Sequence, residues 1–459
     1  MSPRALPSVR FTDRLRGSPT FRRDPLAFLS RGRERYGDIF RFRTLGVPMV
    51  MVNHPDHIRR ILVDKSAQYD KNAFLFKAVR PVLRTGLIAN ADTEQWRRQR
   101  RMMAPHFTPG AVGSFARNMT TETVKMLDRW ERDPRDGRVI DAMDEFGRLA
   151  LAIVNRSLFS ADVSATAQGF EQAFGVANSV LAAFFRRPFP PLSVPTPGHR
   201  RLRRAIDAMD SFVSGFVQGR LRANASADPD ANTDPEPDLL TLLLHSVDEE
   251  DGSGMGLERL HHEVLNLCVG AYETTTNALC WAFHLLARHP DAEKRLHEEV
   301  DRVLGGRIPR FEDLPELAYT RMVVDETLRI YSPAYQFMRH ARQDDEIAGY
   351  RIPAGSNMLI NSYVLHRHPD FWDEPETFRP ERFGAEEAAR RPRHAYIPFG
   401  SGQRVCIGRH FALTELALVL ATVARTHRLV LPADAPDVHP EALITLRPRG
   451  GMRLRLEHR

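Results

Sequence analysis

The sequence predicts a mainly α-helical fold with a small β region. Apolar residues recur at helical spacing from about Leu257 to Arg288, and again directly after Gly408. Two short apolar runs, residues 39–43 and 47–52, predict a β-hairpin. The 459 residues are 42% hydrophobic, which is ample for a core, and their number fits two or three domains or one large unit.

Composition limits the partners and the compartment. The net charge of +7 fits nucleic acid, an anionic membrane or an acidic protein. Because the arginines lie in helical contexts without interleaved aromatic residues, no nucleic-acid binding is expected. The three cysteines, Cys268, Cys280 and Cys406, form no CxxC pair, so neither a disulfide nor a zinc site is expected. This cysteine usage favours a reducing compartment, and we expect a cytoplasmic protein.

No membrane anchor or targeting segment is expected. The first ten residues contain no apolar core of signal-peptide length. The longest apolar tract, Val264 to Ala287, is interrupted by Asn266, Glu273, Asn277 and His284. These interruptions are typical of a buried helix and make the tract a poor membrane span.

The N-terminal part of the chain combines a helix, the hairpin and an apolar loop. A Pro- and Arg-rich segment leads into a helix that ends near Tyr36, where Gly37 is a suitable C-cap. Pro48 has to lie at an edge or at the start of its strand, because it has no N–H to donate. Between residues 71 and 90 the sequence predicts a loop, and its large apolar side chains indicate that this loop covers something.

The next segments are mostly helical. Trp96 and Arg100 are four residues apart and share a helix face suited to a carboxylate, although the pair by itself is better explained by a solvated helix face. Residues 139–185 have a helical pattern that a run of prolines stops, and another helix resumes around 199–204. The polar stretch 224–238 predicts a solvated surface loop.

The long helical pattern in the middle of the chain contains polar residues whose unfavourable placement has to be compensated. Glu273, Thr274, Thr275 and Thr276 lie in the middle of a mostly apolar helix, where propensity disfavours them. A threonine hydroxyl can bond to a carbonyl of the preceding turn and open the helix so that a water fits. The pattern favours a functional site, with a threonine-rich buried helix and a satisfied Glu as the alternative.

Two further patterns lie downstream of this helix. Glu326 and Arg329 are three residues apart on one helix face and can pair, an arrangement that contributes a few tenths of a kcal/mol when isolated. The segment 442–446 predicts a strand close to the end of the sequence.

The most informative stretch is Phe-Gly-Ser-Gly-Gln-Arg-Val-Cys-Ile-Gly, which runs from Phe399 to Gly408 and places Cys406 before a helix. A helix N-terminus favours an anionic thiolate, and Gly400 and Gly402 let backbone N–H groups approach the sulfur. Such a thiolate is a good metal ligand, whereas a lone cysteine is otherwise a small buried hydrophobe. The glycine spacing favours the ligand.

This stretch resembles the haem-binding loop of the cytochrome P-450 (haem-thiolate) family. The resemblance implies haem b, iron protoporphyrin IX, as the cofactor and Cys406 as its axial metal ligand. Phe399 then packs beside the sulfur, Gly408 belongs to the same haem-binding loop, and Arg404 reaches a haem propionate. Donation from a thiolate favours O–O cleavage over reversible oxygen carriage.

The resemblance also implies the overall fold of that family. This fold is a triangular, helix-rich prism around the haem, with residues 1–459 as a single domain. Its β-rich parts are expected at roughly 36–60 and 335–365.

The other motifs match the same family in the same order along the chain. Glu273 and Thr274 resemble its oxygen-activation motif, as the catalytic acid and hydroxyl, with Ala271 where glycine is more common. Glu326, Arg329 and Arg382 match a buried charge cluster that locks the loop before the cysteine and does no chemistry. The propionate contacts that the resemblance implies are Trp96, Arg100, Arg339 and Arg404.

The resemblance further implies a substrate pocket over the distal haem face. The segment 71–90 is its lid, and the helix–loop–helix that contains Phe189 is a roof that moves during substrate entry. For the lid residues, packing in the core is an equally open alternative. The candidate substrate contacts are Phe74, Phe76, Val79, Phe184, Phe185, Ala271, Tyr335, Phe337 and Leu443.

The activity implied is that of a monooxygenase, which inserts one oxygen atom from O2 into a hydrophobic small molecule such as a terpene, fatty acid, steroid or polyketide. The sequence carries no flavin or iron–sulfur motif, so we expect the electrons to come from a separate ferredoxin or flavodoxin. We also expect a monomer. The basic residues Arg97, Arg98 and Arg101 are expected near the docking face.

Two alternatives to this activity stay open. One is a haem-thiolate enzyme that uses peroxide or isomerises its substrate, against which the retention of Glu273 and Thr274 argues. The other is a non-catalytic haem-binding sensor.

Overall fold

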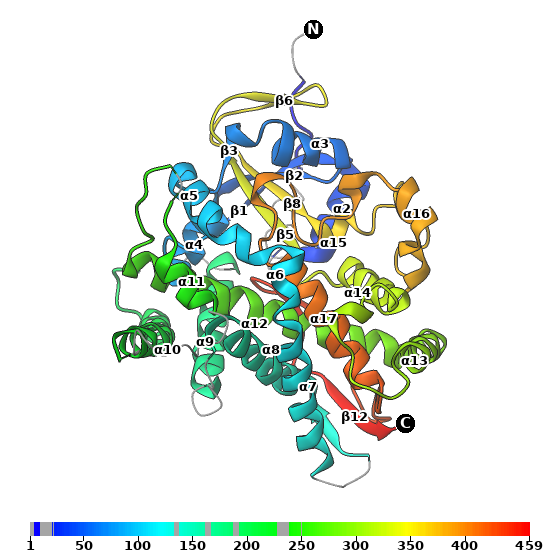
Figure 1. The fold of residues 1–459 in the computed structure, drawn as a ribbon. Helices are drawn as coiled ribbons and strands as arrows, with labels where there is room; N and C mark the ends of the chain where they lie inside the picture. The colour runs from blue at the N-terminus through cyan, green and yellow to red at the C-terminus, as the bar shows by residue number, and fades with distance from the viewer. Residues whose placement is uncertain are drawn as a thin grey trace.

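The computed structural model describes residues 4–9, 21, 23–132, 137–160, 167–186, 192–226, 238–248 and 250–459. Helices form most of the body, and a mixed sheet lies at one end of it (Figure 1). The last strand, β12 (Arg453–His458), lies at the opposite end (Figure 1). The mainly α fold with a small β region is confirmed.

Helices of very different length build the body. The α-helices of the described residues are α2 (Pro25–Tyr36), α3 (Pro55–Arg59), α4 (Phe74–Leu83), α5 (Thr93–Met103), α6 (Pro109–Gly113), α7 (Ala116–Glu131), α8 (Ala142–Phe159), α9 (Ala167–Arg186), α10 (Pro197–Ser226), α11 (Leu239–His245), α12 (Leu257–Arg288), α13 (Pro290–Leu304), α14 (Ala318–Ile330), α15 (Ser362–Leu365), α16 (Ala385–Arg390) and α17 (Arg409–Ala424).

The main sheet has the strand order β1-β2-β8-β5-β3. Strands β2 and β8 are parallel and start their pairing at Met49 opposite Asn357, and the other neighbours are antiparallel. The predicted hairpin is confirmed, and Pro48 lies near the start of its strand, before that pairing begins. The strands are β1 (Ile39–Thr44), β2 (Val47–Val52), β3 (Tyr69–Asp70), β5 (Gln336–Ala341) and β8 (Asn357–Asn361).

Smaller sheets complete the strand inventory of the described residues. Strand β12 pairs with two others in the order β4-β12-β9, and each of two short hairpins stands by itself. The strands are β4 (Val139–Asp141), β9 (His427–Val430), β6 (Asp345–Ile347) with β7 (Tyr350–Ile352), and β10 (Pro440–Ala442) with β11 (Leu446–Pro448).

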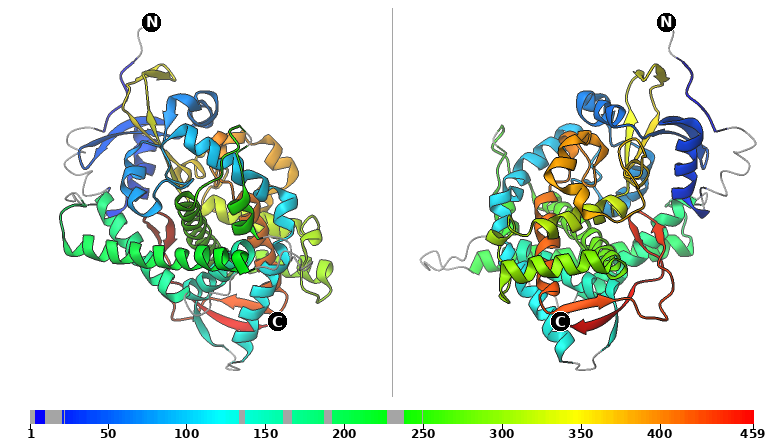
Figure 2. Two further views of the ribbon diagram at one scale, coloured as in Figure 1. Left: turned by 60° about the vertical axis from the view of Figure 1, so that its left-hand side comes forward. Right: turned by 90° about the vertical axis from the view of Figure 1, so that its right-hand side faces the viewer.

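Helix α12 runs through the centre of the molecule with the predicted bounds, Leu257–Arg288. It starts after Gly256, whose φ of 74° favours glycine, and it ends where Pro290 opens α13. Helices α8, α10, α14 and α17 pack around it (Figure 2). Its buried side chains include Trp281, whose ring stacks on Tyr331 at 3.9 Å. This helix is therefore the axis on which the other elements are arranged.

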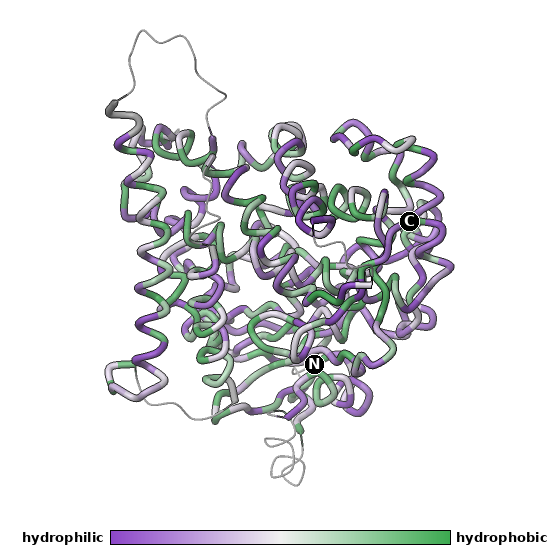
Figure 3. Tube along the Cα trace, turned by 90° about the horizontal axis from the view of Figure 1, so that it is seen from below, coloured by the Kyte–Doolittle hydropathy of each residue, from purple (hydrophilic) through white to green (hydrophobic). Residues whose placement is uncertain are grey.

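Helices α9 and α10 lie side by side at one edge of the molecule. Along α10, hydrophilic and hydrophobic residues alternate, as the purple and green segments of the long helix in Figure 3 show. Such an amphipathic helix buries one stripe and exposes the other. Among the residues with known placement, no helix is long and apolar enough to cross a membrane.

Three sequence predictions are corrected by the fold. The segment between 71 and 90 contains the helix α4, because burial of its apolar face outweighs the cost of Pro81 near its end. Residues 139–185 open with strand β4 and hold two helices, the first of which ends at Ser160 in a left-handed conformation. In the segment 442–446 only the two end residues belong to strands, β10 and β11, and residues 443–445 form the turn between them, closed by a hydrogen bond from Leu443 N to Thr445 O of 3.0 Å.

Other predictions lie wholly or partly outside the described residues. Helix α10 continues to Ser226, and residues 227–237 of the predicted surface loop are not among those described. The same holds for Phe189 and for the side chain of Phe185.

Candidate active site

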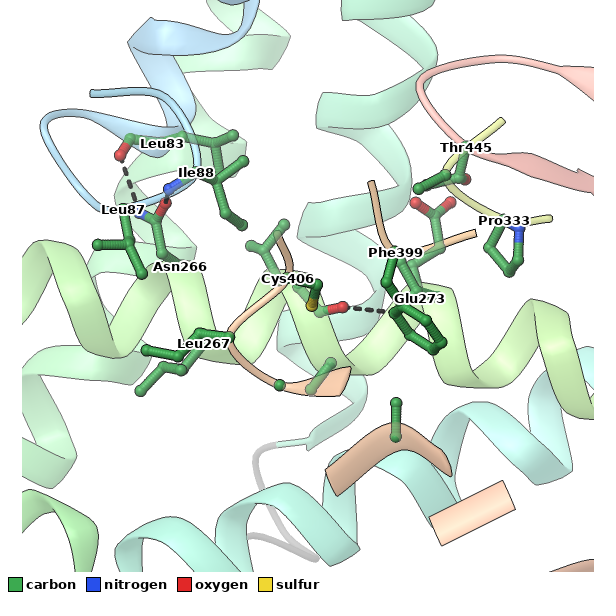
Figure 4. Close-up of a pocket in the computed structure, with 18 of the residues that line it drawn as sticks. Leu83, Leu87, Ile88, Asn266, Leu267, Glu273, Pro333, Phe399, Cys406 and Thr445 are labelled. Carbon is green, nitrogen blue, oxygen red and sulfur yellow. Dashed lines mark hydrogen bonds between the residues drawn. The ribbon is translucent and has the colours of Figure 1, made fainter. Parts of the chain in front are cut away.

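A cavity of about 400 Å³ lies between the middle of α12, the segment after α4 and the loop before α17. Figure 4 shows Cys406 and Phe399 beside α12, with Leu83, Ile88 and Asn266 towards one end and Thr445 and Pro333 towards the other. The cavity therefore joins segments that are far apart in the sequence.

The cysteine loop is held in a conformation that requires glycine. Gly400 and Gly402 have φ values of 73° and 71°, where a side chain is strained. A Cβ at residue 402 would also lie 1.9 Å from the carbonyl oxygen of Leu62. The hydrogen bond from Cys406 N to Phe399 O, of 2.9 Å, closes the loop. These contacts explain why the glycines occur at this spacing.

Gly402→Ala is expected to destabilise the protein by about 2–4 kcal/mol, because a methyl group meets the Leu62 carbonyl in a strained conformation. Urea unfolding measures the loss. Gly215→Ala is the control, since a Cβ there meets nothing within 4 Å and an alanine favours helix α10. A Gly402→Ala variant as stable as the wild type contradicts the close approach.

Cys406 exposes its side chain, and the surface it exposes faces the cavity. Burial of the loop raises the pKa of its thiol, while the Gly408 N–H and the charges of Arg100 and Lys71 lower it. Burial outweighs the other influences, so the helix terminus alone does not favour the thiolate, contrary to the expectation from sequence. A metal cation at the sulfur reverses this balance, because coordination deprotonates a thiol.

Four cationic side chains line the same cavity: Lys71, Arg100, Arg339 and Arg404. Each donates a hydrogen bond to a main-chain carbonyl, those of Ile88, Val405, Met338 and Asn90 respectively. Burial lowers the pKa of all four, to about 10 for Arg339 and to about 9 for Arg404. Lys71 and Arg339 are buried and Arg100 and Arg404 half-buried, and such a group of cations fits an anionic ligand.

Trp96 lies in the same part of the cavity. Its side chain is buried, and the guanidinium of Arg404 lies 4.1 Å from its ring centroid. The guanidinium of Arg100, one turn further along α5, lies at 5.6 Å. These cation–π contacts orient both arginines without neutralising them. The residues present therefore fit a haem, with a sulfur ligand for its iron and cations for its propionates.

The predicted charge cluster is assembled and buried. Arg329 donates to both carboxylate oxygens of Glu326, at 2.7 and 2.8 Å, and Arg382 Nε lies 3.3 Å from Glu326 Oε1. All three side chains are at most 2% exposed. Glu326 therefore makes a bidentate contact with Arg329 and a further contact with Arg382. Together these contacts are stronger than an isolated pair on a helix surface.

This cluster is connected to the cysteine loop. Arg329 also donates to the carbonyl of His366, whose Nε2 accepts from Ile397 N, two residues before Phe399. Burial lowers the pKa of His366 to about 3, which keeps this nitrogen an acceptor. The cluster therefore fixes the segment that leads to the cysteine.

Helix α12 faces the cavity with Ala271, Glu273 and Thr274. Thr274 Oγ1 donates to the Gly270 carbonyl at 2.6 Å, as the sequence predicts for a hydroxyl that opens the helix. Glu273 accepts a hydrogen bond of 2.5 Å from Asn178 Nδ2 on α9. Burial raises the pKa of Glu273 to about 7, with a hydrogen bond from Thr445 acting against it.

The predicted substrate contacts divide between two cavities. Phe76, Val79, Ala271 and Phe337 line the main cavity. Phe74, Tyr335 and Leu443 instead line a second cavity of about 50 Å³ beside α2 and the main sheet. Phe184 packs edge-on against His199, between α9 and α10.

These positions follow from helix and turn geometry. On α4, Phe76 and Val79 are three apart and share the face turned to the main cavity, while Phe74 lies on another face. Leu443 turns with the tight β10–β11 connection, and Thr445 of the same turn reaches the main cavity instead.

Sequence reasoning missed several polar residues of the cavity wall: Lys71, Asn178, Glu263 and Asn266. No motif in the sequence singles them out as residues of one site. Glu415 on α17 was missed too, and its Oε2 accepts from Thr275 Oγ1 at 3.3 Å.

Two of the arginines predicted at a docking face have partners within the chain. Arg98 and Arg101 both pair with Asp248, at 2.9 and 2.7 Å, and Asp248 has a side chain only 2% exposed. Arg97 is exposed. The expected contribution of Arg98 and Arg101 to docking is therefore reduced, since their charges are balanced internally.

Comparison with known proteins agrees with this geometry. A family model described as Cytochrome P450 matches residues 18–454. Pentalenene oxygenase of Streptomyces avermitilis is 35% identical over 441 residues, which are 95% of this chain and 94% of that protein. Cyclooctat-9-en-7-ol 5-monooxygenase of Streptomyces melanosporofaciens is 34% identical over 411 residues, 89% of this chain and 85% of that protein.

The fold has a close counterpart among solved structures. The crystal structure of the cytochrome P450DA heme domain matches with a TM-score of 0.88 at 25% identity, covering 100% of this chain and 98% of that one. The similarity therefore extends over the whole described fold.

Proposed function

The chain belongs to the cytochrome P450 family of monooxygenases, and on this premise we propose that it binds haem b through Cys406 and inserts one oxygen atom from O2 into a terpenoid. The observation that carries the proposal is the pairing of one accessible sulfur with four cationic side chains, two buried and two half-buried, in one cavity. A haem has an iron, which the sulfur can bind, and two carboxylates, which the cations can bind.

The residues around the cofactor have distinct tasks in this proposal. Lys71, Arg100, Arg339 and Arg404 hold the propionates, and Trp96 supports the two arginines that lie over it. Phe399 covers the sulfur side, and the Glu326 cluster keeps the cysteine loop in place. When bound, the haem supplies the redox and oxygen chemistry, which the protein does not carry out itself.

Proton supply is the task of α12. Thr274 holds its hydroxyl at the Gly270 carbonyl, facing the cavity, and Glu273 has a pKa of about 7, suited to taking up and releasing a proton near neutral pH. This pair favours activation of O2 over use of peroxide, because peroxide already carries the protons that O2 has to gain.

The substrate class follows from the cavity and from the relatives. Many of the side chains that line the cavity are apolar, among them Leu83, Leu87, Ile88, Phe174 and Leu181. Pentalenene, named for one relative, is a terpene hydrocarbon, and a rigid polycyclic molecule suits a preformed apolar cavity. We propose a separate ferredoxin or flavodoxin as the electron donor.

Reconstitution tests the proposal. The haem-loaded protein, a surrogate bacterial ferredoxin with its reductase, NADH and isotopically labelled O2 are incubated with pentalenene and related terpenes. The expected product carries one labelled oxygen atom, and Cys406→Ala forms none. A product that forms equally well with peroxide in the absence of O2 would instead identify a peroxide-using enzyme.

A further inference from the structure

One buried carboxyl group in the cavity wall has half of its hydrogen-bonding capacity unused. Glu263 on α12 lies in the wall of the main cavity and is 0% exposed. Its Oε2 accepts from Leu87 N at 3.0 Å, in the segment after α4. Among the described residues, none is hydrogen-bonded to its Oε1. An unsatisfied buried polar atom is costly, so its retention needs a reason.

Holding the segment after α4 does not require a carboxyl group. Asn266, three residues further along α12, performs the same task with an amide and uses all its groups (Figure 4). Its Oδ1 accepts from Ile88 N at 3.1 Å, and its Nδ2 donates to the carbonyls of Leu83 and His262. The contrast between a satisfied amide and a half-satisfied acid indicates a second role for Glu263.

The chemistry of that role follows from the surroundings of the acid. Burial raises the pKa of Glu263 to about 8, so the group is protonated at neutral pH. A protonated carboxyl group both donates and accepts a hydrogen bond. With the proton on Oε1, the O–H can turn towards a ligand in the cavity while Oε2 still accepts from Leu87 N. The matching ligand group is an alcohol, which donates and accepts in the same way.

Position along the helix places this group far from the reaction centre. Glu263 and Thr274 are eleven residues apart, about three turns, so both lie on the same face of α12 and about 16 Å apart along its axis. A ligand whose hydroxyl group meets Glu263 therefore presents its opposite end near Thr274 and Cys406.

We propose that Glu263 determines specificity by binding a hydroxyl group of the substrate, at the end opposite the carbon that is oxidised. The inference rests on the proposed function and narrows it: the enzyme acts on an elongated apolar molecule that already bears oxygen. An earlier hydroxylation, or a cyclisation that ends in capture of water, has to supply such a substrate.

Spectral titration of the haem-loaded protein tests the inference with three diterpenoids on one carbon skeleton: dehydroabietane, its alcohol dehydroabietinol and its amine dehydroabietylamine. The wild type is expected to bind the alcohol at least about five-fold more tightly than the hydrocarbon, the difference that one satisfied hydrogen bond makes. Glu263→Met should abolish this preference, and Glu263→Gln should keep it, because its amide still accepts from Leu87 N and still donates.

The control is Glu299→Gln on α13, another buried carboxylate, whose oxygens already accept from Tyr319 N and Thr320 N at 2.6 and 2.8 Å. Its ligand preference should equal that of the wild type. The inference is overturned if the wild type binds alcohol and hydrocarbon equally, binds neither, or prefers the amine in a titration whose spectrum shows no ligation of the amine nitrogen to the iron. A carbon monoxide complex with thiolate character in the same samples shows that the proposed haem site is intact even if this inference fails.

Discussion

Glu326→Gln is expected to lower the free energy of unfolding by about 3–5 kcal/mol and to reduce the haem content of the purified protein. The carboxylate of Glu326 is 0% exposed and faces two arginines, Arg329 and Arg382, so its loss leaves two buried cations with one neutral partner. The effect reaches the haem loop because Arg329 also holds His366, which binds Ile397.

Urea unfolding and the ratio of haem to protein absorbance measure the two effects. Glu387→Gln is the matched control, because Glu387 pairs with Arg379 at 3.1 Å on the surface with both side chains more than a third exposed. Loss of such a pair changes stability by less than about 1 kcal/mol. A Glu326→Gln variant that keeps wild-type stability and haem content would falsify the locking role.

Thr274→Ala is expected to retain the fold and the haem but to reduce the product formed per NADH by at least about ten-fold, with peroxide released instead. The Thr274 hydroxyl lies at the cavity and is held on the Gly270 carbonyl at 2.6 Å, where it can pass a proton during O2 reduction. Without it, reduced oxygen leaves before the substrate reacts.

The chain supplies a close control for this prediction. Thr276 makes the same bond to the carbonyl four residues back, Tyr272, at 2.7 Å, and its side chain is buried away from the solvent. Thr276→Ala should therefore show the structural cost of removing such a hydroxyl without the loss of coupling. Full coupling in Thr274→Ala, or equal uncoupling in both variants, contradicts the relay.

The sequence was sufficient for the elements whose signals are local. The central helix was predicted with its bounds because its apolar spacing is long and is closed by glycine and proline at the two ends. The hairpin of β1 and β2 is also predicted from a local signal, two short apolar runs joined around Gly46. The cysteine loop was recognisable because its glycines are fixed by backbone geometry, which leaves a trace in sequence.

Predictions failed where tertiary burial decides the structure. The segment after Lys71 looked like a loop because of Pro81, yet its apolar face makes it a helix. The turn at Leu443 was predicted as a strand because three apolar residues in a row carry no mark of a reversal. Strand β4 pairs with β12 from the other end of the chain, a contact that no local pattern reveals.

The residues of the site divide in the same way, into those that lie in local sequence motifs and those that only the fold brings to the cavity. The sulfur, the acid and the threonine lie in recognisable motifs, whereas Lys71 and Glu263 become members of the cavity only through folding. Neither residue belongs to a motif whose spacing could identify it. Their roles depend on which main-chain groups happen to satisfy them, and that depends on the fold.

The central claim is that Cys406 is the thiolate ligand of a haem, and the carbon monoxide difference spectrum of the dithionite-reduced protein tests it most directly. The wild type is compared with Cys406→His and with Cys268→Ala. The second variant removes a buried thiol that lies outside the cysteine loop, on α12. The expected result is a Soret band at about 450 nm in the wild type and in Cys268→Ala, and its absence in Cys406→His.

A band at about 420 nm in folded wild-type protein, or no haem at all, would contradict thiolate ligation by Cys406 and with it the proposed function.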